Sequence, residues 1–479
     1  MNKDKLIQEL FQKVEDLTLR VQQLEVFEKE NKTLRQENTA LKAEVTELKG
    51  RLNSNSSNSS KPPSSDGYKS KPAFAKKHKG IKGGQKGHKG SNLKQISNPD
   101  KIVKCCPESC SCGHEFTKDE LTLAEKRQVF DLPQPKLEVT EYRLHKANCP
   151  VCGKVNKGLA PEGINAPAQY GNGAKSFAVM LNVHYKMPYK KIQLLFEDLF
   201  GCPINESTIY TAAKKCYRAL EDSEQIIRTR VASSPVAHAD ETGVRVEGRL
   251  QWLHTASNFL YTYLFIHGNR GKLAMESDKS IIGNIKGWLV HDCWSSYFSF
   301  TGHRHAICGA HILRELQGLI DTGQSKWAKT FKIFLMNIYE MPFAQRLKQK
   351  QQIESRFRRI CNLGEFMEPP PIKTPGKRGR YKRTKGRNLV ERLIKHQDAV
   401  LAFAFNEQVP FTNNLAERDI RHVKIKQKIS NSFRSFEGAE IYARIEGFIS
   451  TARKNKMNIF NQLCITFEGR NFITEKLGC

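Results

Sequence analysis

Three acidic residues stand in sequence contexts that could gather them around divalent metal ions. Asp240 follows the short, largely apolar run 236–239, and Asp292 ends a second apolar segment. Glu417 falls in the first turn of a helix predicted to begin near Asn413. Carboxylates from two strands and a helix can hold two divalent cations about 3.5–4 Å apart, the arrangement that drives in-line phosphoryl displacement. Hard carboxylate oxygens suit Mg²⁺, with Mn²⁺ as the substitute. Taken singly, an Asp at a strand end is more often a turn former.

The predicted helix that carries Glu417 also carries a basic face. Arg421, Lys424 and Lys428 follow Glu417 at i+4, i+7 and i+11, so the four side chains share one side of the helix. A metal-binding Glu in line with three cations is expected if a phosphate backbone lies along that face, which predicts DNA contacts for the three basic residues. The plainer alternative is a solvated basic helix.

The elements that must position these acids read as strands and helices of one α/β domain. Segments 250–256 and 259–266 are rich in aromatic and β-branched residues and predict two further strands after the one that ends at Asp240. We expect a break in the first strand at Gly243, a helix near 271–280, and another buried strand before Asp292. Asp278 and Asp419 are neighbouring acids that match no part of the pattern.

Composition and charge indicate a polyanionic partner. The chain has 479 residues, 39% of them hydrophobic, and a formal net charge of +29. Basic residues are clustered: residues 61–101 hold eleven Lys against two Asp, and residues 373–387 hold eight Lys or Arg and no acid. Such clusters suit phosphate contacts. No apolar run approaches the roughly 18 residues that a membrane span needs, so we expect a cytoplasmic protein without a membrane partner.

The cysteines predict a structural Zn²⁺ site. Thirteen Cys, an odd number with several in pairs, favour metal binding over a disulfide framework. Cys149 and Cys152 form a C-x₂-C knuckle followed by a glycine, and Cys110 and Cys112 form a shorter pair, also before a glycine. Cys106 is the alternative ligand on that first side. Buried free thiols are the plainer reading.

The N-terminal part of the chain predicts a coiled coil followed by a flexible basic linker. Leu10, Leu17 and Leu24 repeat every seven residues, and the repeat restarts at Phe27 after a three-residue step. A homo-oligomer is therefore expected, against the alternative of a lone helix packed on the protein itself. Residues 53–100, rich in Ser, Gly, Lys and Pro, cannot build a core.

Two further segments carry recognisable patterns. In the region 160–235, the stripe Ile192, Leu195, Phe196, Leu199 ends at Gly201, and a second helix should bury Ile209, Ala213, Cys216 and Leu220, which allows a helix-turn-helix.

Cys308 and His311 form a C-x₂-H pair. Since no further zinc ligands lie nearby in the sequence, we interpret this pair as structural support around the acidic site.

Together, His238–Gly243, the segment ending in Asp292, and Asn413–Arg418 with Lys424 and Lys428 resemble the DDE transposases of the IS66 insertion-sequence family. The resemblance extends over nearly the whole chain, because segments 57–66 and 83–90 are also similar to the family's N-terminal region. It implies that Asp240, Asp292 and Glu417 are the catalytic triad of a ribonuclease-H-like fold. The family has C-x₂-C-G where this sequence has Cys110-x-Cys112-Gly, one residue shorter, which leaves the first zinc pair open.

The function implied is that of a DNA transposase. It would bind the terminal inverted repeats of its element and catalyse metal-dependent strand cleavage and strand transfer into target DNA, associated with the bacterial nucleoid when bound. Small accessory proteins of the element are also implied as partners. The alternatives are a catalytically inactive zinc-finger and coiled-coil regulator, and a ribonuclease-H-like nuclease without strand transfer.

The expected fold class is a multidomain α/β protein with a ribonuclease-H-like mixed-sheet core. The expected domains are a coiled coil (1–52), a flexible basic linker (53–100), a zinc-binding domain (101–160), a helical DNA-binding domain (161–233), the catalytic domain (234–450) with an insertion at about 322–405, and a C-terminal helical tail (451–479).

Overall fold

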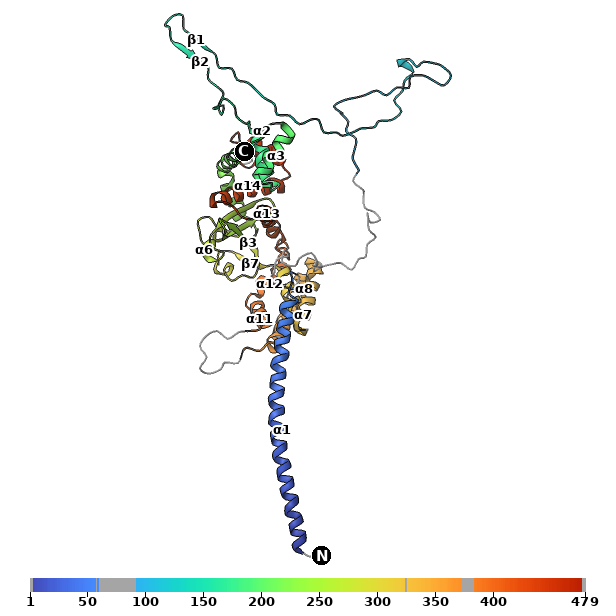
Figure 1. Ribbon diagram of the computed structural model, residues 1–479, viewed down its shortest axis with the longest axis vertical. Coiled ribbons are helices and arrows are strands. Elements are labelled where there is room, and N and C mark those ends of the chain that lie inside the picture. The colour runs from blue at the N-terminus through green and yellow to red at the C-terminus, as the bar shows by residue number, and fades with distance from the viewer. Residues whose placement is uncertain (1–2, 57, 60–91, 324, 372–382, 476–479) are drawn as a thin grey trace. The chain divides into compact units, whose positions relative to one another are not determined.

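The computed structural model describes residues 3–56, 58–59, 92–323, 325–371 and 383–475 of the chain (Figure 1). Most of the predicted basic linker, and residues 373–382 of the basic stretch 373–387, lie outside these residues. The chain divides into two compact units. The first comprises Met1–Phe74, Tyr170–Tyr189 and Ser207–Cys479, and the second comprises Ala75–Gln169 and Lys190–Glu206.

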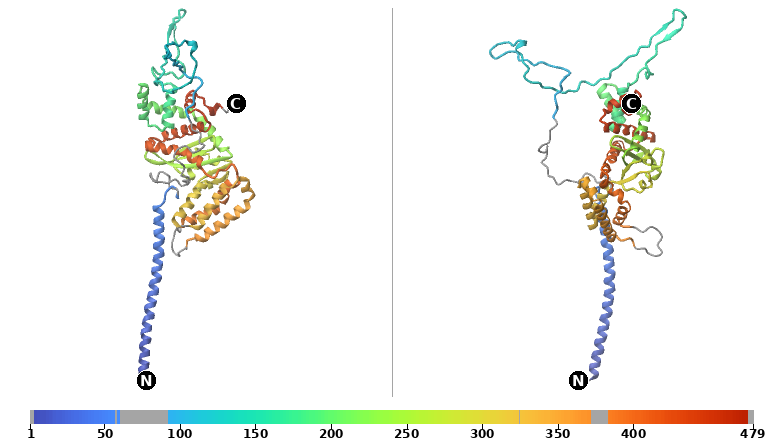
Figure 2. Two further views of the ribbon diagram at one scale, coloured as in Figure 1. Left: turned by 90° about the vertical axis from the view of Figure 1, so that its right-hand side faces the viewer. Right: turned by 180° about the vertical axis from the view of Figure 1, so that it is seen from behind.

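Helix α1 (Lys3–Leu52) is a single long helix, seen at the blue end of the ribbon (Figure 2). The three-residue step between Leu24 and Phe27 does not interrupt it. Its predicted heptad side chains are exposed, including Leu24 at 65% and Leu34 at 61%. A stripe of exposed apolar side chains along a helix is what a coiled-coil partner covers. Coiled-coil pairing of α1 stays a prediction.

A five-stranded mixed sheet forms the centre of the first unit. Its strand order is β5-β4-β3-β6-β7. The first three strands in sequence pair antiparallel, whereas β6 and β7 run parallel to β3. The strands are β3 (Val236–Val246), β4 (Arg249–Ser257), β5 (Thr262–His267), β6 (Trp288–His291) and β7 (Arg304–Ile307).

The prediction that the first strand ends at Asp240 is wrong. Strand β3 continues to Val246, and Gly243 pairs in register with Trp252. A Cβ on Gly243 would lie 2.9 Å from a methyl carbon of Leu250, so the glycine makes room for that side chain rather than breaking the strand. The turn comes at Glu247 and Gly248, whose φ angles of 52° and 75° suit a two-residue hairpin.

Hydrophobic cores cover both faces of the sheet, because neighbouring strand residues point to opposite sides. In β6, Leu289 belongs to one core and Val290 to the other. The first core includes residues from α4 (Glu206–Ala219), α5 (Glu221–Ala232), α13 (Asn414–Ser430), α14 (Phe436–Lys454), α15 (Ile459–Thr466) and α16 (Phe472–Glu475). The second includes residues from α7 (Gly309–Gly323), α8 (Lys326–Glu340), α10 (Lys350–Met367), α11 (Lys385–Lys395) and α12 (Gln397–Phe405).

The region predicted to be helical before the sheet is helical. All four residues predicted to point inward are buried: Ile209, Ala213 and Cys216 in α4, and Leu220 directly after it. Helix α3 (Tyr189–Phe200) buries Ile192 and Phe196 but exposes Leu199, and Gly201 follows it with a φ of 64°. Because α3 and α4 belong to different units, the helix-turn-helix stays a prediction.

The remaining elements are short. The helix predicted near 271–280 is only α6 (Lys272–Met275). The others are α2 (Asn172–Val179), the π-helical turn η4 (Met180–His184), α9 (Phe343–Lys348), the strands β1 (Lys146–Asn148) and β2 (Val155–Lys157), and the 3₁₀ turns η3 (Lys118–Glu120), η5 (Ile282–Asn284) and η6 (Tyr297–Ser299). None of the described helices is long and apolar enough to cross a membrane.

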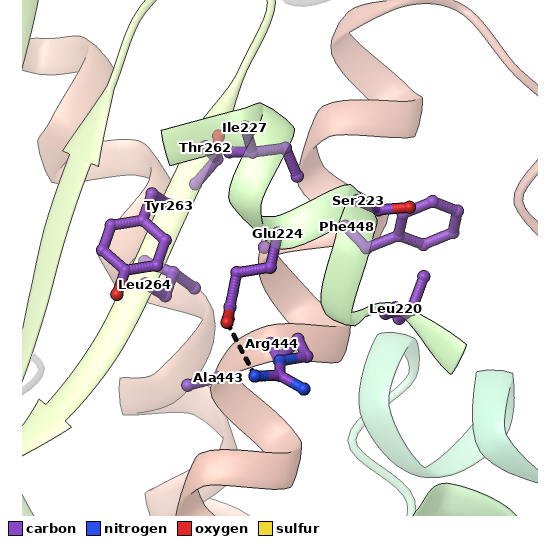
Figure 3. A pocket seen from close by; sticks show the side chains of 11 residues that line it. Leu220, Ser223, Glu224, Ile227, Thr262, Tyr263, Leu264, Ala443, Arg444 and Phe448 are labelled. Carbon is purple, nitrogen blue, oxygen red and sulfur yellow. Dashed lines mark ion pairs between the residues drawn. The ribbon is translucent and has the colours of Figure 1, made fainter. Parts of the chain in front are cut away.

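A small cavity lies between α5, β5 and α14 (Figure 3). Its volume is about 10 Å³, and an ion pair between Glu224 and Arg444 closes one side at 2.8 Å. A space of this size holds about one water molecule. The cavity is therefore a packing feature and not a substrate site.

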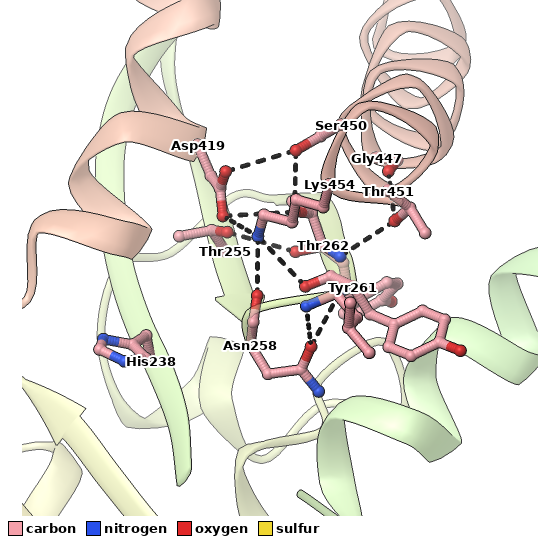
Figure 4. Close-up of polar contacts among 12 residues, drawn as sticks. His238, Thr255, Asn258, Tyr261, Thr262, Asp419, Gly447, Ser450, Thr451 and Lys454 are labelled. Atoms are coloured by element: carbon pink, nitrogen blue, oxygen red, sulfur yellow. Dashed lines mark hydrogen bonds and ion pairs between the residues drawn. The ribbon is translucent and has the colours of Figure 1, made fainter. Parts of the chain in front are cut away.

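A buried ion pair fixes α13 against β5 and α14 (Figure 4). Lys454 Nζ lies 2.7 Å from Asp419 Oδ2, and these side chains are only 14% and 9% exposed. Thr262 and Ser450 also donate hydrogen bonds to the Asp419 carboxylate. Because Asp419 lies two residues after Glu417, this network holds the first turns of α13 in place. Asp419 is therefore a poor comparison residue for Glu417, whereas Asp278 is exposed.

Replacing Asp419 with Ala should lower the free energy of unfolding by about 3 kcal/mol, because Lys454 would be left buried without its partner. Urea denaturation followed by tryptophan fluorescence measures this, since all four tryptophans lie between residues 252 and 327. The double variant D419A/K454M should be more stable than D419A. D278A should change stability by less than about 0.5 kcal/mol. A D419A protein as stable as the parent would contradict the role given to this ion pair.

Candidate active site

The fold gathers the three predicted acids around the middle of the sheet. Asp240 lies in the interior of β3, and Asp292 follows the last residue of β6. The parallel pairing of β3 with β6 stops at His238, so β3 extends beyond its neighbour at the point where Asp240 stands. Glu417 lies in the first turn of α13, which packs against β3. Two strands and a helix supply the carboxylates, as predicted.

Asn413 attaches the beginning of α13 to β3. Its side-chain nitrogen donates to the Ala239 carbonyl at 2.7 Å, so its oxygen faces His238 Nδ1 at 2.9 Å. Burial lowers the pKa of His238 to about 4, so this imidazole is neutral at pH 7. The neutral ring must then carry its proton on Nδ1 to donate to Asn413. Asn413 thereby attaches the start of α13, and Glu417 with it, to the β3 backbone beside Asp240.

The environment of Asp240 disfavours a bare negative charge. Burial, followed by the charges of Glu241, Asp292 and Glu417, raises the pKa of Asp240 to about 8. Asp240 Oδ1 accepts the Glu241 backbone N–H at 2.9 Å, but no basic side chain in the described part of the chain pairs with it. A bound cation would offset this cost, so the donor set suits a hard divalent metal.

The three carboxylates are close enough to influence one another but do not form one compact ligand group. Among the described residues, one group of three side chains of the types His, Cys, Asp or Glu could hold a metal ion. One ligand atom of each side chain lies within 4.8 Å of those of the other two. That group contains Glu417 but neither Asp240 nor Asp292; its other members are Cys308 and His311.

A fourth carboxylate, Glu241, was not predicted from the sequence. Burial and then the charge of Asp292 raise its pKa to about 7. Tyr297 donates to Glu241 Oε2 at 2.6 Å, and Arg270 pairs with Oε1 at 2.8 Å. Arg270 also lies 3.9 Å from Asp292 Oδ2. No local pattern signals this set, because Arg270 follows Glu241 by 29 residues.

The predicted basic face of α13 is used unevenly. Arg421 and Lys428 are exposed, so both are available to a phosphate backbone. Lys424 is also exposed, but its ammonium donates to the Gly243 carbonyl at 2.5 Å. Lys424 thus joins α13 to β3, and a DNA contact by this residue would require that hydrogen bond to be exchanged.

In the second unit, the predicted zinc ligands lie in two similar turns. The N–H of Cys149 donates to the Lys154 carbonyl, and Gly153 N–H donates back to Cys149. The shorter turn makes the same two hydrogen bonds over a span with one residue fewer. Cys110 N–H donates to the His114 carbonyl, and Gly113 N–H donates to the Cys110 carbonyl. Both glycines have positive φ, 68° at Gly153 and 89° at Gly113. The turn at Cys110 is one residue shorter than the turn at Cys149, but the same two hydrogen bonds close it.

Backbone N–H groups also favour the thiolate form of the first cysteine in each turn. The Cys112 N–H lowers the pKa of Cys110, and the Cys152 N–H lowers the pKa of Cys149. Thiolates are the form that binds zinc. Cys105 and Cys106 are exposed and lie before the first turn. The structure does not bring the sulfurs of the two turns into one group.

Comparison with known protein families assigns the chain. Residues 168–441 match the Transposase IS66 family, and residues 107–153 match the zinc-finger binding domain of transposase IS66. Residues 4–94 match a family of unknown function, DUF6444. The first match covers more than half of the chain, so this protein belongs to the IS66 transposase family. No curated protein matches the sequence.

Family membership establishes the class of protein. The chain is a transposase, an enzyme that processes nucleic acid, and DNA is its partner class. Its zinc-finger match indicates Zn²⁺ binding, and the family implies a divalent metal.

The pH dependence of stability should reveal the buried charge of Asp240. Its pKa rises from 3.8 to about 8 on folding, so the native state holds the proton more tightly and stability falls as pH rises between these values. Asp240→Asn removes this loss. In the absence of added Mg²⁺, the variant should exceed the parent by on the order of 2 kcal/mol at pH 8 and by much less at pH 5.

Urea denaturation of both proteins at several pH values measures this difference. D278N, at an exposed acid, should show no such pH-dependent gain. An advantage of D240N that is equal at pH 5 and pH 8 would show that Asp240 is ionised without cost in the native state.

Proposed function

We propose that this protein is a DDE transposase that binds the ends of its own insertion sequence and catalyses metal-dependent strand cleavage and strand transfer. Asp240, Asp292 and Glu417 are its catalytic residues and hold Mg²⁺ or Mn²⁺. The observation that carries the proposal is the position of the three acids: Asp240 lies on the central strand β3, Asp292 directly follows the parallel strand β6, and Glu417 lies in the first turn of α13, which packs against β3.

The sheet topology supports a ribonuclease-H-like core. Three antiparallel strands are followed by two strands parallel to the first, in the order β5-β4-β3-β6-β7. This order puts Asp240 on the central strand and Asp292 at the end of its parallel neighbour. Glu417 arrives from α13 after the helical segment α8–α12, which corresponds to the proposed insertion at about 322–405.

When bound, the divalent ions would activate first a water molecule and then the freed 3′-hydroxyl, and would offset the charge that builds up on the attacked phosphate. The protein's own residues have separate tasks. Asp240, Asp292 and Glu417 bind the ions, and Asn413 holds Glu417 in register with Asp240. Arg421 and Lys428, with Lys424 after its hydrogen bond is exchanged, orient the DNA backbone along α13.

Asp240→Asn, Asp292→Asn and Glu417→Gln should each reduce strand cleavage by at least about a thousandfold, because the amide keeps the shape but loses the charge that binds a hard cation. The assay uses linear DNA carrying the element's ends with Mg²⁺, and separate binding measurements should show that end binding is retained. A double variant should be no worse than either single variant, because the three residues act as one unit.

Asp278→Asn is the matched control and should cleave at the parental rate, since it is an exposed acid outside the site. Near-parental cleavage by any one of the three variants would remove that residue from the catalytic set. Cleavage without joining in the parent protein would support a nuclease instead, and no cleavage at all would support a DNA-binding regulator.

We further propose that Cys110, Cys112, Cys149 and Cys152 bind one structural Zn²⁺, with Cys106 as a substitute only if the shorter pair fails. The matching turn closures around Cys110 and Cys149 support this choice of ligands.

Cys149→Ser should lose about one Zn²⁺ per chain and should render the 101–160 segment sensitive to proteases, because structural zinc supplies folding free energy. Elemental analysis of the full-length protein after dialysis measures the zinc. Cys464→Ser, which lies outside the zinc-finger match, should keep the parental amount. An unchanged zinc content in C149S would refute the ligand assignment.

The other segments and partners predicted from the sequence are part of the same proposal. We propose that α1 forms a homo-oligomeric coiled coil through its exposed heptad side chains, and that residues 53–100 form a basic linker that contacts DNA. Residues 161–233 would bind the inverted repeats, 234–450 would form the catalytic domain, and 451–479 the C-terminal tail. The protein would act at the nucleoid, with small accessory proteins of the element as further partners.

A further inference from the structure

Cys308, His311 and Glu417 bring three metal-ligand atoms around one point. One atom of each side chain lies within 4.8 Å of the other two. Cys308 directly follows β7, His311 lies in the first turn of α7, and Glu417 lies in the first turn of α13. The sequence predicted only the first two as a pair, because Glu417 is more than a hundred residues further along the chain.

Close backbone packing holds the two helix starts together. The N–H of Gly309 donates to the Phe411 carbonyl at 2.8 Å, and a Cβ on Gly309 would lie 2.2 Å from the Phe411 ring. Only glycine allows this approach. A second contact involves one of the three ligands: the backbone N–H of Asn413 donates to the Cys308 sulfur at 3.2 Å. The Cys308 sulfur is thereby held next to the residue that precedes α13.

Two of the three ligand atoms are buried without a partner. His311 Nδ1 and Glu417 Oε1 are both inaccessible to solvent and make no hydrogen bond. They lie 3.8 Å from each other, and the other carboxylate oxygen of Glu417 lies 3.8 Å from Arg314. Buried polar atoms left unpaired cost free energy, and such atoms in a native structure call for an explanation.

The ligand chemistry identifies the class of ion. Thiolate and imidazole suit Zn²⁺ and similar transition metals, whereas Mg²⁺ prefers oxygen ligands. Zinc ligands at about 2.0–2.3 Å in a tetrahedron stand about 3.3–3.8 Å apart, close to the 3.8 Å between the His311 and Glu417 atoms. We propose that Cys308 Sγ, His311 Nδ1 and Glu417 Oε1 form a Zn²⁺ site with a fourth position open.

This site is separate from the zinc-finger ligands and adjoins the acidic site through Glu417. It does not rest on the proposed function, because Cys308 and His311 are not among the proposed Mg²⁺ ligands. If both sites form, Glu417 serves each of them, and the Zn²⁺ fixes the orientation of a carboxylate that the strand-cleavage step uses.

The test is the zinc content of the full-length protein after reconstitution with Zn²⁺ alone and removal of excess metal. The parent should bind about one more Zn²⁺ per chain than Cys308→Ser or His311→Ala. Cys361→Ser, a buried cysteine outside the ligand group, is the matched control and should bind the parental amount. With Co²⁺ in place of Zn²⁺, C308S should also lose the part of the thiolate absorption band that belongs to this site.

Equal zinc content in the parent, C308S and H311A would overturn the proposal. His311 decides the outcome if C308S does not fold, because its side chain is 27% exposed and tolerates replacement better than the fully buried Cys308. Asp240→Asn separates this site from the proposed function: it should abolish cleavage while keeping the parental zinc content.

Discussion

A carboxylate buried in the interior of a β-strand is costly, and Asp240 occupies such a position in β3. Its pKa of about 8 shows that the surroundings favour the protonated form, while three further acids stand nearby. Glu241 has Arg270 and Tyr297 as partners, but within the described residues Asp240 has only a backbone N–H. This arrangement lowers the stability of the fold when Asp240 is ionised, and under the proposed function a divalent cation would offset that cost.

Two contacts hold the start of α13, and Glu417 with it, in place against that repulsion. Asn413 links the start of α13 to β3, and the Asp419–Lys454 pair links the next turn to β5 and α14. The two attachments lie on either side of Glu417 in the sequence. These contacts restrain the start of α13, so Glu417 is held near β3 by the fold itself. Such advance positioning is what the proposed metal-dependent catalysis would need.

The sequence predicts the secondary structure around each acidic residue better than the contacts that the residue makes. Local patterns were sufficient for Asp292 after its strand, Glu417 in the first turn of α13, and the inward face of α4. The continuation of β3 beyond Asp240 was missed because Gly243 looks like a break, whereas the turn residues are Glu247 and Gly248.

Two sets of residues join across long distances in the sequence and leave no local signal. Arg270 meets Glu241 through the β4–β5 hairpin, and Glu417 meets Cys308 and His311 only after the whole helical segment between them has folded. Single-sequence periodicity reports which face of an element is apolar, but it does not report which polar side chains from separate elements meet. The C-x₂-H pair is visible in the sequence, but its neighbour Glu417 is not.

The central claim is that Asp240, Asp292 and Glu417 bind divalent cations together. Anomalous diffraction from crystals of the full-length protein bound to end DNA and Mn²⁺ tests it most directly, because Mn²⁺ replaces Mg²⁺ and can be located without assumptions about the ligands. We predict two Mn²⁺ peaks about 3.5–4 Å apart, with Asp240 as a ligand of at least one. A map in which no peak lies within about 2.5 Å of an Asp240 oxygen would contradict the claim.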